Sequence, residues 1–276
     1  MSQTPALQIP VSADPAASLV QESPRQAVPL AAECVSCGAM LTGAYCQACG
    51  QKAMGRFTFP NILQHLVTDA LDLNKGLLFT AWSLLRDPGR VVRDYVAGRT
   101  VRYTNPVKYL LIVVTLVVLV YVQMGALDAM MAALKPGTDP SAELAKNPMG
   151  SWMVGHLNVM MLVGLPFLAV ASWLVFRRAR LNYAEHLIFN LYVYAQQSLM
   201  SLLLVTPLFA AGQVVPGIVV QCLITLGYYA WAASGFFQMR PLPAFLRTLG
   251  AQIVGGLLSA VAGGIIGAAV ALSKLL

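Results

Sequence analysis

Charged residues are scarce in this sequence of 276 residues, in which Asp, Glu, Lys and Arg together make up only 11%. A soluble domain of this length carries about 25% charged residues. Hydrophobic residues instead make up 58% of the chain, and they gather in long runs. These runs predict several membrane-spanning helices rather than one large soluble core.

Recognisable catalytic motifs are also missing. The sequence contains no HExxH, no GxSxG and no Gly-rich phosphate loop between a strand and a helix, and its only histidines are His65, His156 and His186. A membrane-embedded lipid enzyme would need a nucleophile or a catalytic metal set, and neither is evident. We therefore predict that the protein is not an enzyme.

The first thirty residues lack the basic start and apolar stretch of a signal peptide. They are rich in Pro, Ser, Ala and Gln and show no apolar periodicity. Residues 1–30 are accordingly predicted to form a disordered tail.

Five later segments are apolar over lengths that can cross a bilayer, which takes roughly 20 helical residues. The predicted spans cover residues 106–126, 152–176, 184–211, 216–237 and 249–272. The third and fourth are separated only by GQVVP, which predicts a tight helical hairpin. The expected fold is thus an all-α integral membrane protein, with a five-span domain at residues 106–276.

The positions of the basic residues predict how these spans are oriented. Fifteen of the eighteen Lys and Arg residues lie before or at the start of the first span, or in the loops after the second and fourth spans. Cytoplasmic segments are enriched in Lys and Arg. We therefore expect the N-terminus in the cytoplasm and the C-terminus outside. The net charge of +7 then requires no nucleic-acid partner.

Four of the five cysteines stand together in CVSCGAMLTGAYCQACGQK, at Cys34, Cys37, Cys46 and Cys49. In a reducing compartment a CxxC pair holds metal more often than it forms a disulfide, and four thiolates suit tetrahedral zinc. Gly38 and Gly50 fit tight knuckles that need a positive φ. Residues 31–55 are too few to build a core, so we predict a zinc-ribbon-like unit whose folding energy comes from a structural zinc ion.

Two alternatives for these cysteines remain open. A redox-active pair fits a single CxxC better than two with matching glycines. Iron in place of zinc is compatible with four thiolates. The fifth cysteine, Cys222, lies within a predicted span and is expected to be a small buried hydrophobe.

Residues 56–105 are predicted to form cytoplasmic or interfacial amphipathic helices, the first of them over residues 60–73. Asp87 and Pro88 are residue types that often begin a helix, and Gly98 is a residue type that often ends one.

The helix between Pro88 and Gly98 carries Arg90 and Arg93 beside apolar residues, and two interpretations of it stay open. In the first interpretation, the helix lies in the membrane interface and attracts anionic headgroups. In the second, it packs on the bundle as a soluble cap.

The order of these motifs resembles an uncharacterised bacterial family of membrane proteins, known only as a domain of unknown function. The resemblance covers roughly residues 34–250 and implies a bacterial inner-membrane location with no known activity. Thr100 stands where the family usually has a second basic residue. The matching positions, besides the cysteines, are Gly76, Thr80, Arg86, Pro88, Gly89, Gly98, Arg99, Tyr103 and Pro106.

The third predicted span carries His186, Asn190 and Gln197 on one helix face, with Glu185 beside them at the cytoplasmic edge. Such side chains usually face the protein interior and are candidate functional groups. The alternative is that they make hydrogen bonds between helices. Further polar residues lie in other spans, at His156, Asn158 and Gln221.

Small residues recur at every fourth position near the C-terminus, at Gly255, Ser259, Gly263 and Gly267. This spacing allows helices to approach closely. Its partner is either another span of the same chain or a second subunit in a homo-oligomer.

Two functional classes fit these features. The favoured one is a non-enzymatic membrane scaffold or regulator, whose zinc unit docks a cytoplasmic protein. The alternative is a transporter or channel for a small solute or ion, lined by the polar face of the third span and regulated by the zinc unit. The absence of charges at span midplanes and of matched interruptions in paired spans favours the scaffold. Pro166 and Pro207 count against that choice, because each can break its helix near a cavity.

Overall fold

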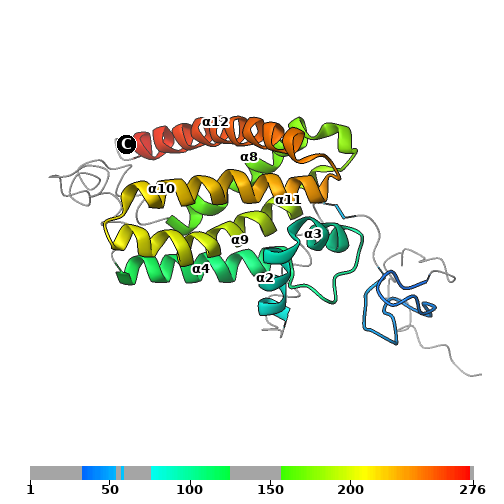
Figure 1. The fold of residues 1–276 in the computed structure, drawn as a ribbon. Helices are drawn as coiled ribbons and strands as arrows, with labels where there is room; N and C mark the ends of the chain where they lie inside the picture. Colours follow the sequence, from blue (N-terminus) through cyan, green and yellow to red (C-terminus); the bar gives the residue numbers. More distant parts are fainter. Residues whose placement is uncertain (1–32, 54–56, 59–75, 125–156, 274–276) are drawn as a thin grey trace, which may run out of the picture.

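The computed structural model describes residues 33–53, 57–58, 76–124 and 157–273. These residues form a bundle of α-helices, and within them the only β-structure is two isolated bridges (Figure 1). The predicted all-α class is confirmed. The predicted tail (1–30), the predicted helix over 60–73, His65 and His156 lie outside the described residues.

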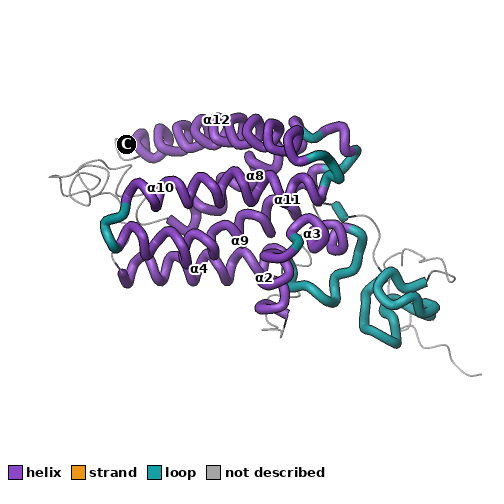
Figure 2. Tube along the Cα trace, in the orientation of Figure 1, coloured by secondary structure: helices purple, strands orange, loops and turns teal. Residues whose placement is uncertain are grey.

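Long helices lie side by side in the bundle, and two short helices precede them (Figure 2). The short ones are α2 (Gly76–Arg86) and α3 (Pro88–Val96). The long ones are α4 (Pro106–Met124), α8 (Leu157–Val175), α9 (Tyr183–Ala210) and α12 (Pro241–Ser273). Between α9 and α12 run α10 (Val214–Cys222), the π-helical stretch η3 (Leu223–Tyr228) and α11 (Tyr229–Phe236), without a break.

Three helical segments are long and apolar enough to cross a membrane, namely Tyr183–Ala210, Val214–Phe236 and Pro241–Gly263. Helices α4 and α8 contain shorter apolar stretches among the described residues, Pro106–Tyr121 and Gly164–Val175. The chain is therefore an α-helical membrane protein, and the count of five spans stays a prediction.

The last helix differs from its predicted bounds. It begins at Pro241, whereas the apolar run predicted a start at residue 249. The intervening sequence PLPAFLRTLG contains Arg247, which ends an apolar run although its long side chain can reach a polar surface from within a helix. Pro166 and Pro207 lie inside α8 and α9, and both helices continue through them.

The predicted caps of α3 are confirmed. The Asp87 carboxylate accepts a hydrogen bond from the Arg90 amide at 3.0 Å, and Pro88 is the first helical residue. Gly98, two residues beyond the end of the helix, has a φ of +91°, a conformation that glycine adopts without strain.

The predicted hairpin between α9 and α10 is present as well. Gly212 turns the chain with a φ of +71°, and Gly217 lies directly beneath the ring of Phe209, where a Cβ would come within 3.2 Å of a ring carbon.

Helix α9 is the central helix and packs against α4, α8 and α10. Helix α12 lies along α8, where a Cβ on Gly255 would lie 3.0 Å from Leu168, and Gly164 faces the Ser259 hydroxyl. The first half of the small-residue face thus packs within the chain. Among the described side chains a Cβ on Gly263 would meet nothing within 4 Å, and a homo-oligomer through this face remains a prediction.

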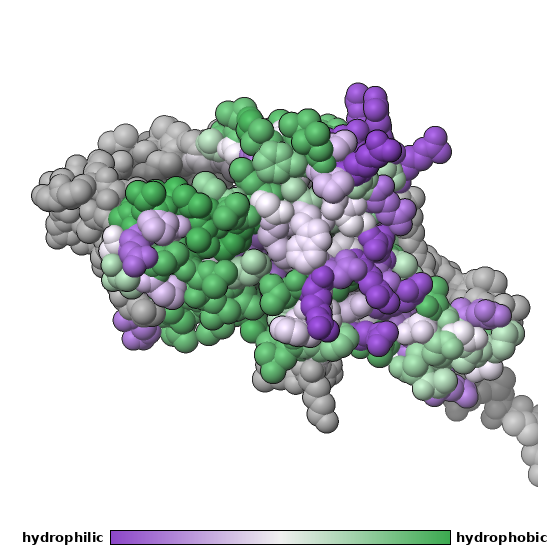
Figure 3. Space-filling view, in the orientation of Figure 1, coloured by the Kyte–Doolittle hydropathy of each residue, from purple (hydrophilic) through white to green (hydrophobic). Residues whose placement is uncertain are grey.

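Three basic segments meet at one end of the bundle, here called the basic end. The rings of Phe176 and Phe237 stack with centroids 4.2 Å apart, which brings together the loops that carry Arg177 and Arg240. Helix α3, with Arg90, packs on the end of α11 in the same region. Figure 3 shows many hydrophilic side chains gathered there and a smaller hydrophilic group at the opposite end of the bundle, with a broad apolar surface between them.

Candidate metal centre

The four predicted ligands come together in the cysteine unit, residues 33–53. Their sulfur atoms all lie within 4.8 Å of one another, with 3.6 Å between Cys34 and Cys49 and 3.5 Å between Cys37 and Cys46. A tetrahedral ion with Zn–S bonds of about 2.3 Å requires sulfurs about 3.8 Å apart. All four thiols are free of disulfides. The geometry and the donor set therefore fit a metal ion, and four thiolates serve zinc and iron alike. The prediction that Cys222 is buried is wrong, because this residue is exposed on α10.

The unit consists of two knuckles that repeat the same local structure twelve residues apart. In the first, the Cys34 amide donates to Ala39, the Gly38 amide donates to Cys34, and a bridge joins Glu33 to Met40. The second knuckle has the same two amide bonds, and the equivalent bridge joins Tyr45 to Lys52.

The two knuckle glycines have the predicted positive φ, at +76° for Gly38 and +72° for Gly50. Only glycine enters this conformation readily. Each glycine lets its chain turn sharply directly after the second cysteine of a pair, so that all four thiols converge on one point.

The thiols differ in how easily they ionise. The hydrogen bond from the Cys37 amide is the main cause that lowers the pKa of Cys34 to about 7. The Ala39 amide lowers the pKa of Cys37, but the sulfurs of Cys49 and Cys46 and burial outweigh it, and the pKa of Cys37 rises to about 12. Four thiolates so close together repel one another, and a divalent cation is what relieves that repulsion.

An apolar core cannot replace the metal. Within the described unit the buried hydrophobic residues are Cys34, Cys46 and Leu41, with Ala39, Cys49 and Ala53 partly buried around them. A set this small cannot offset the entropy lost on ordering the chain. An ion bound by the four thiols would supply the stability that this small core lacks.

Gln51 joins the cysteine unit to the loop that leads into α4. Its side chain is 1% exposed, and its Oε1 accepts hydrogen bonds from the amides of Thr100 and Val101 at 3.1 and 3.3 Å. Its Nε2 donates to the Thr100 hydroxyl at 3.1 Å and to the Lys52 carbonyl at 3.0 Å. Gln51 thus forms hydrogen bonds with Thr100, the residue at which this sequence departs from the family pattern.

Resemblance-defining residues between positions 76 and 106 make hydrogen bonds within this connecting segment (residues 76–105). The Thr80 hydroxyl donates to the Gly76 carbonyl at 2.7 Å and accepts from the Thr104 amide at 2.8 Å, which ties α2 to the start of α4. Asp94 accepts from Arg99 at 2.9 Å and from the Tyr103 hydroxyl at 3.2 Å.

Gly89 allows a close backbone approach of the connecting segment to the bundle. A Cβ on Gly89 would lie 2.5 Å from the Cα of Gly235 in α11. The neighbouring Val91, Val92 and Tyr95 are all buried. Of the two interpretations of α3, the structure shows the packed cap, with the apolar side of the helix turned to the bundle.

The predicted polar face of α9 is buried and hydrogen-bonded. Asn190 donates to the Ser172 hydroxyl at 2.9 Å and to the His186 carbonyl at 2.7 Å, and it accepts from the Tyr229 hydroxyl at 2.8 Å. His186 Nδ1 lies 3.1 Å from Ser172 Oγ, whereas its Nε2 has no hydrogen-bond partner among the described residues. Glu185 caps its own helix by accepting from the Asn182 amide at 2.8 Å.

Gln197 reaches the π-helical stretch η3, where its Nε2 donates to the carbonyls of Ile224 and Thr225 at 2.9 and 3.0 Å. Gln221 bridges the same helices by accepting from Ser201 and donating to the Thr225 hydroxyl, each at 3.0 Å. These contacts agree with the interpretation of the stripe as hydrogen bonds between helices. The side chain of Asn158 and all of His156 fall outside what the structure describes.

Sequence reasoning missed three of these residues. The repeat of the two knuckles could have identified Gln51. It stands at the position that Ala39 has in the first knuckle, and a polar side chain at that position needs a hydrogen-bond partner. The sequence indicates Gly235 more weakly: it is a glycine within an apolar helix, where no turn requires a glycine. Nothing in the sequence indicates Asp94 beyond its position between arginines.

Comparison with known proteins supports the resemblance over one segment. Neither the curated proteins nor the solved structures contain a match to this chain. Residues 74–118 match the sequence model of a family described as "Protein of unknown function (DUF3667)", which covers α2, α3 and most of α4.

Proposed function

We propose that this protein is a non-enzymatic membrane scaffold or regulator, in which the zinc-loaded cysteine unit binds a protein partner in the cytoplasm. The observation that carries the proposal is the surface of that unit. Met40 and Tyr45 are 61% and 58% exposed, although each belongs to one of the bridges that close the knuckles. Large exposed apolar side chains of this kind are the groups that a protein partner would cover.

The attachment of the unit supports the same function. Gln51 holds it against the connecting segment, and Asn182 at the start of α9 donates to the Phe57 carbonyl at 2.9 Å. A partner bound to the cysteine unit would therefore be fixed close to the bundle rather than tethered loosely.

The proposed location is the bacterial inner membrane, with the cysteine unit in the cytoplasm and the C-terminus outside. The gathering of Arg90, Arg177 and Arg240 at the basic end supports this orientation, because cytoplasmic segments are rich in arginine and lysine.

The test begins with metal content. Purified full-length protein should carry about one equivalent of zinc, matching a single site with four thiolate ligands. Cys46→Ser should lose most of it, and the matched control Cys222→Ser, which removes a cysteine outside the unit, should retain it. Zinc that persists in Cys46→Ser, or iron in its place, refutes the zinc site.

Docking is then tested with a photo-crosslinking amino acid at position 45 of the full-length protein in native membranes. We expect one dominant protein adduct, which Cys46→Ser abolishes and Cys222→Ser preserves. The identified partner, once purified, should bind wild type and fail to bind Met40→Ser that still carries zinc. Equal binding to both proteins contradicts a docking role for this surface.

A transporter or channel is the second candidate, favoured by the π-helical stretch beside Gln197 and by the unpartnered Nε2 of His186 among the described residues. Interruptions of helical geometry inside membranes often occur at functional sites. Reconstituted protein that moves a solute or ion in a way that His186→Ala abolishes would favour this function over the scaffold.

A further inference from the structure

Helix α2 exposes one apolar face, formed by Leu78, Phe79, Trp82 and Leu85. Their exposed fractions are 80%, 45%, 56% and 42%, and their positions follow the spacing of a single helix face. The opposite face is fixed to the protein, because Thr80 bonds to Thr104 and the Tyr228 hydroxyl donates to the Leu84 carbonyl at 3.0 Å. The helix is thus held in one orientation with its apolar face outward.

The position of α2 matches the surface of a bilayer. Thr80 holds α2 beside Thr104, two residues before α4 begins. In Figure 1 the helix runs across the direction of the long helices instead of along it. Further along the chain from Thr104, α4 exposes Leu111, Leu116 and Leu119, as expected of a surface that contacts acyl chains. The apolar face of α2 therefore lies at the edge of the apolar belt.

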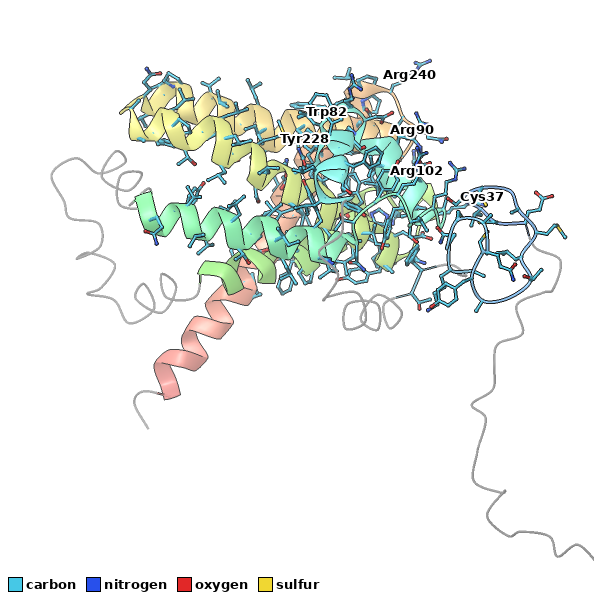
Figure 4. All side chains as sticks on the ribbon, turned by 90° about the horizontal axis from the view of Figure 1, so that it is seen from below. Cys37, Trp82, Arg90, Arg102, Tyr228 and Arg240 are labelled. Carbon is cyan, nitrogen blue, oxygen red and sulfur yellow. The ribbon has the colours of Figure 1, made fainter. Side chains whose placement is uncertain are left out.

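The charge around α2 complements anionic lipids. The connecting segment contains five arginines and two aspartates. One of those aspartates, Asp94, is already paired with Arg99 at 2.9 Å. The Arg86 guanidinium lies 5.1 Å from the centre of the Trp82 ring. Figure 4 shows Arg90 and Arg102 between Trp82 and the cysteine unit in that view.

From this placement we propose that α2 is an interfacial helix of the bilayer. Leu78, Phe79, Trp82 and Leu85 insert among the upper acyl chains, and Arg86 binds the phosphate of an anionic lipid while it stacks on Trp82. Tryptophan is enriched in this layer, because its ring contacts hydrocarbon while its N–H forms hydrogen bonds with water. Arginine reaches from the apolar layer to the headgroups. The inference is independent of any partner of the cysteine unit.

The test uses full-length protein in which Trp82 is the only tryptophan, through W152F, W173F and W231F, reconstituted in phosphatidylcholine vesicles. Lipids brominated near the headgroup end of the acyl chain should quench Trp82 fluorescence more strongly than lipids brominated near the chain terminus. Aqueous iodide should quench it weakly. Strong iodide quenching with no effect of either brominated lipid overturns the proposal, as does shielding from all three, which would mean that a second copy or another protein covers the helix.

A second arm tests the headgroup. Adding phosphatidylglycerol to the vesicles should shift Trp82 emission to shorter wavelength, and Arg86→Gln should abolish that shift. The control Arg178→Gln removes an exposed arginine of the basic end outside α2 and should leave the shift intact. A shift that survives Arg86→Gln refutes the lipid contact of Arg86. Leu78→Asp should move the emission to longer wavelength without lowering the thermal stability of the bundle, since Leu78 is 80% exposed and contributes little to its core.

Discussion

Replacing Gly89 with alanine should loosen α3 from the bundle. The added Cβ would lie 2.5 Å from the Cα of Gly235, 2.6 Å from its carbonyl carbon and 2.6 Å from the backbone nitrogen of Phe236. Carbon atoms in contact are ordinarily about 3.5–4.0 Å apart, so α3 must move outward by about 1 Å. The obstacle is backbone on both sides, and no flexible side chain can move aside to accommodate the methyl group.

The energy of this clash is comparable with the energy that docks α3. Overpacking of this kind costs about 1–3 kcal/mol. Burial of Val91 and Val92, which are 2% and 0% exposed, stabilises the docked helix by about 3–6 kcal/mol. We therefore expect α3 to open more often while the bundle itself stays folded. In detergent, the purified variant should be cut faster by trypsin after Arg90 and Arg93, and its apparent Tm should fall slightly.

Two glycine variants serve as controls for that experiment. Gly235→Ala introduces the same contact from the other side, but its nearest atom is 3.1 Å away, so its effect should be smaller. The Cβ that Gly256→Ala adds in α12 meets nothing within 4 Å among the described residues, so this variant should be neutral or stabilise the helix by up to about 1 kcal/mol. A Gly89→Ala protein with the trypsin pattern and Tm of wild type would refute the close approach of α3 and α11.

Three further predictions concern other parts of the molecule. Gln51→Ala should keep its metal but expose the amides of Thr100 and Val101, which hydrogen–deuterium exchange would show as faster exchange there; unchanged exchange contradicts the Gln51 contacts. Asn190→Leu removes hydrogen bonds to Ser172, His186 and Tyr229 and should destabilise the bundle by about 1–2 kcal/mol, since such bonds contribute about 0.6 kcal/mol each in membranes. Chemical unfolding in bicelles measures this, and a loss below the error of the method would mean that water replaces Asn190. A reporter active only in the cytoplasm, fused after Leu276, should stay silent if the spans are odd in number, and a strong signal rules out the five-span topology.

Much of the metal centre follows from sequence because it is local. Two CxxCG motifs twelve residues apart already contain every ligand and both positive-φ glycines, and the structure confirms that the four sulfurs converge. The start of α3 at Asp87 and Pro88 is equally local, since a cap and the first helical residue are neighbours in the chain.

The partner of an apolar helix face is not local, and this is where prediction reaches its limit. The spacing of Val91, Val92 and Tyr95 indicates a buried face, but lipid chains and the interior of a bundle are equally apolar. Periodicity alone therefore left the packed cap and the interfacial helix open for α3. The structure buries α3 and exposes α2, whose face of Leu78, Phe79, Trp82 and Leu85 is just as regular.

The polar face of α9 shows the same division. The spacing of His186, Asn190 and Gln197 placed them on one side of a helix, and all three are buried there. The residues that they bond to come from α8, α11 and η3. No sequence motif predicts the π-helical geometry of η3. The two carbonyls that Gln197 binds belong to that stretch, so these hydrogen bonds are not predictable from the spacing of the polar residues.

The segment that matches the family, residues 74–118, includes neither the cysteines nor the second half of the bundle. Four of its motif residues make contacts near the junction between them: Thr80 bonds to the Thr104 amide just before α4, Gly89 lets α3 pack on α11, and Arg99 and Tyr103 bond to Asp94. Gln51 then fastens the cysteine unit to the same loop. The matched segment therefore contains the contacts that connect the cysteine unit to the bundle. A docking unit needs such a connection to hold its partner at a fixed place on the bundle, whereas a flexible tether would leave the partner free to move.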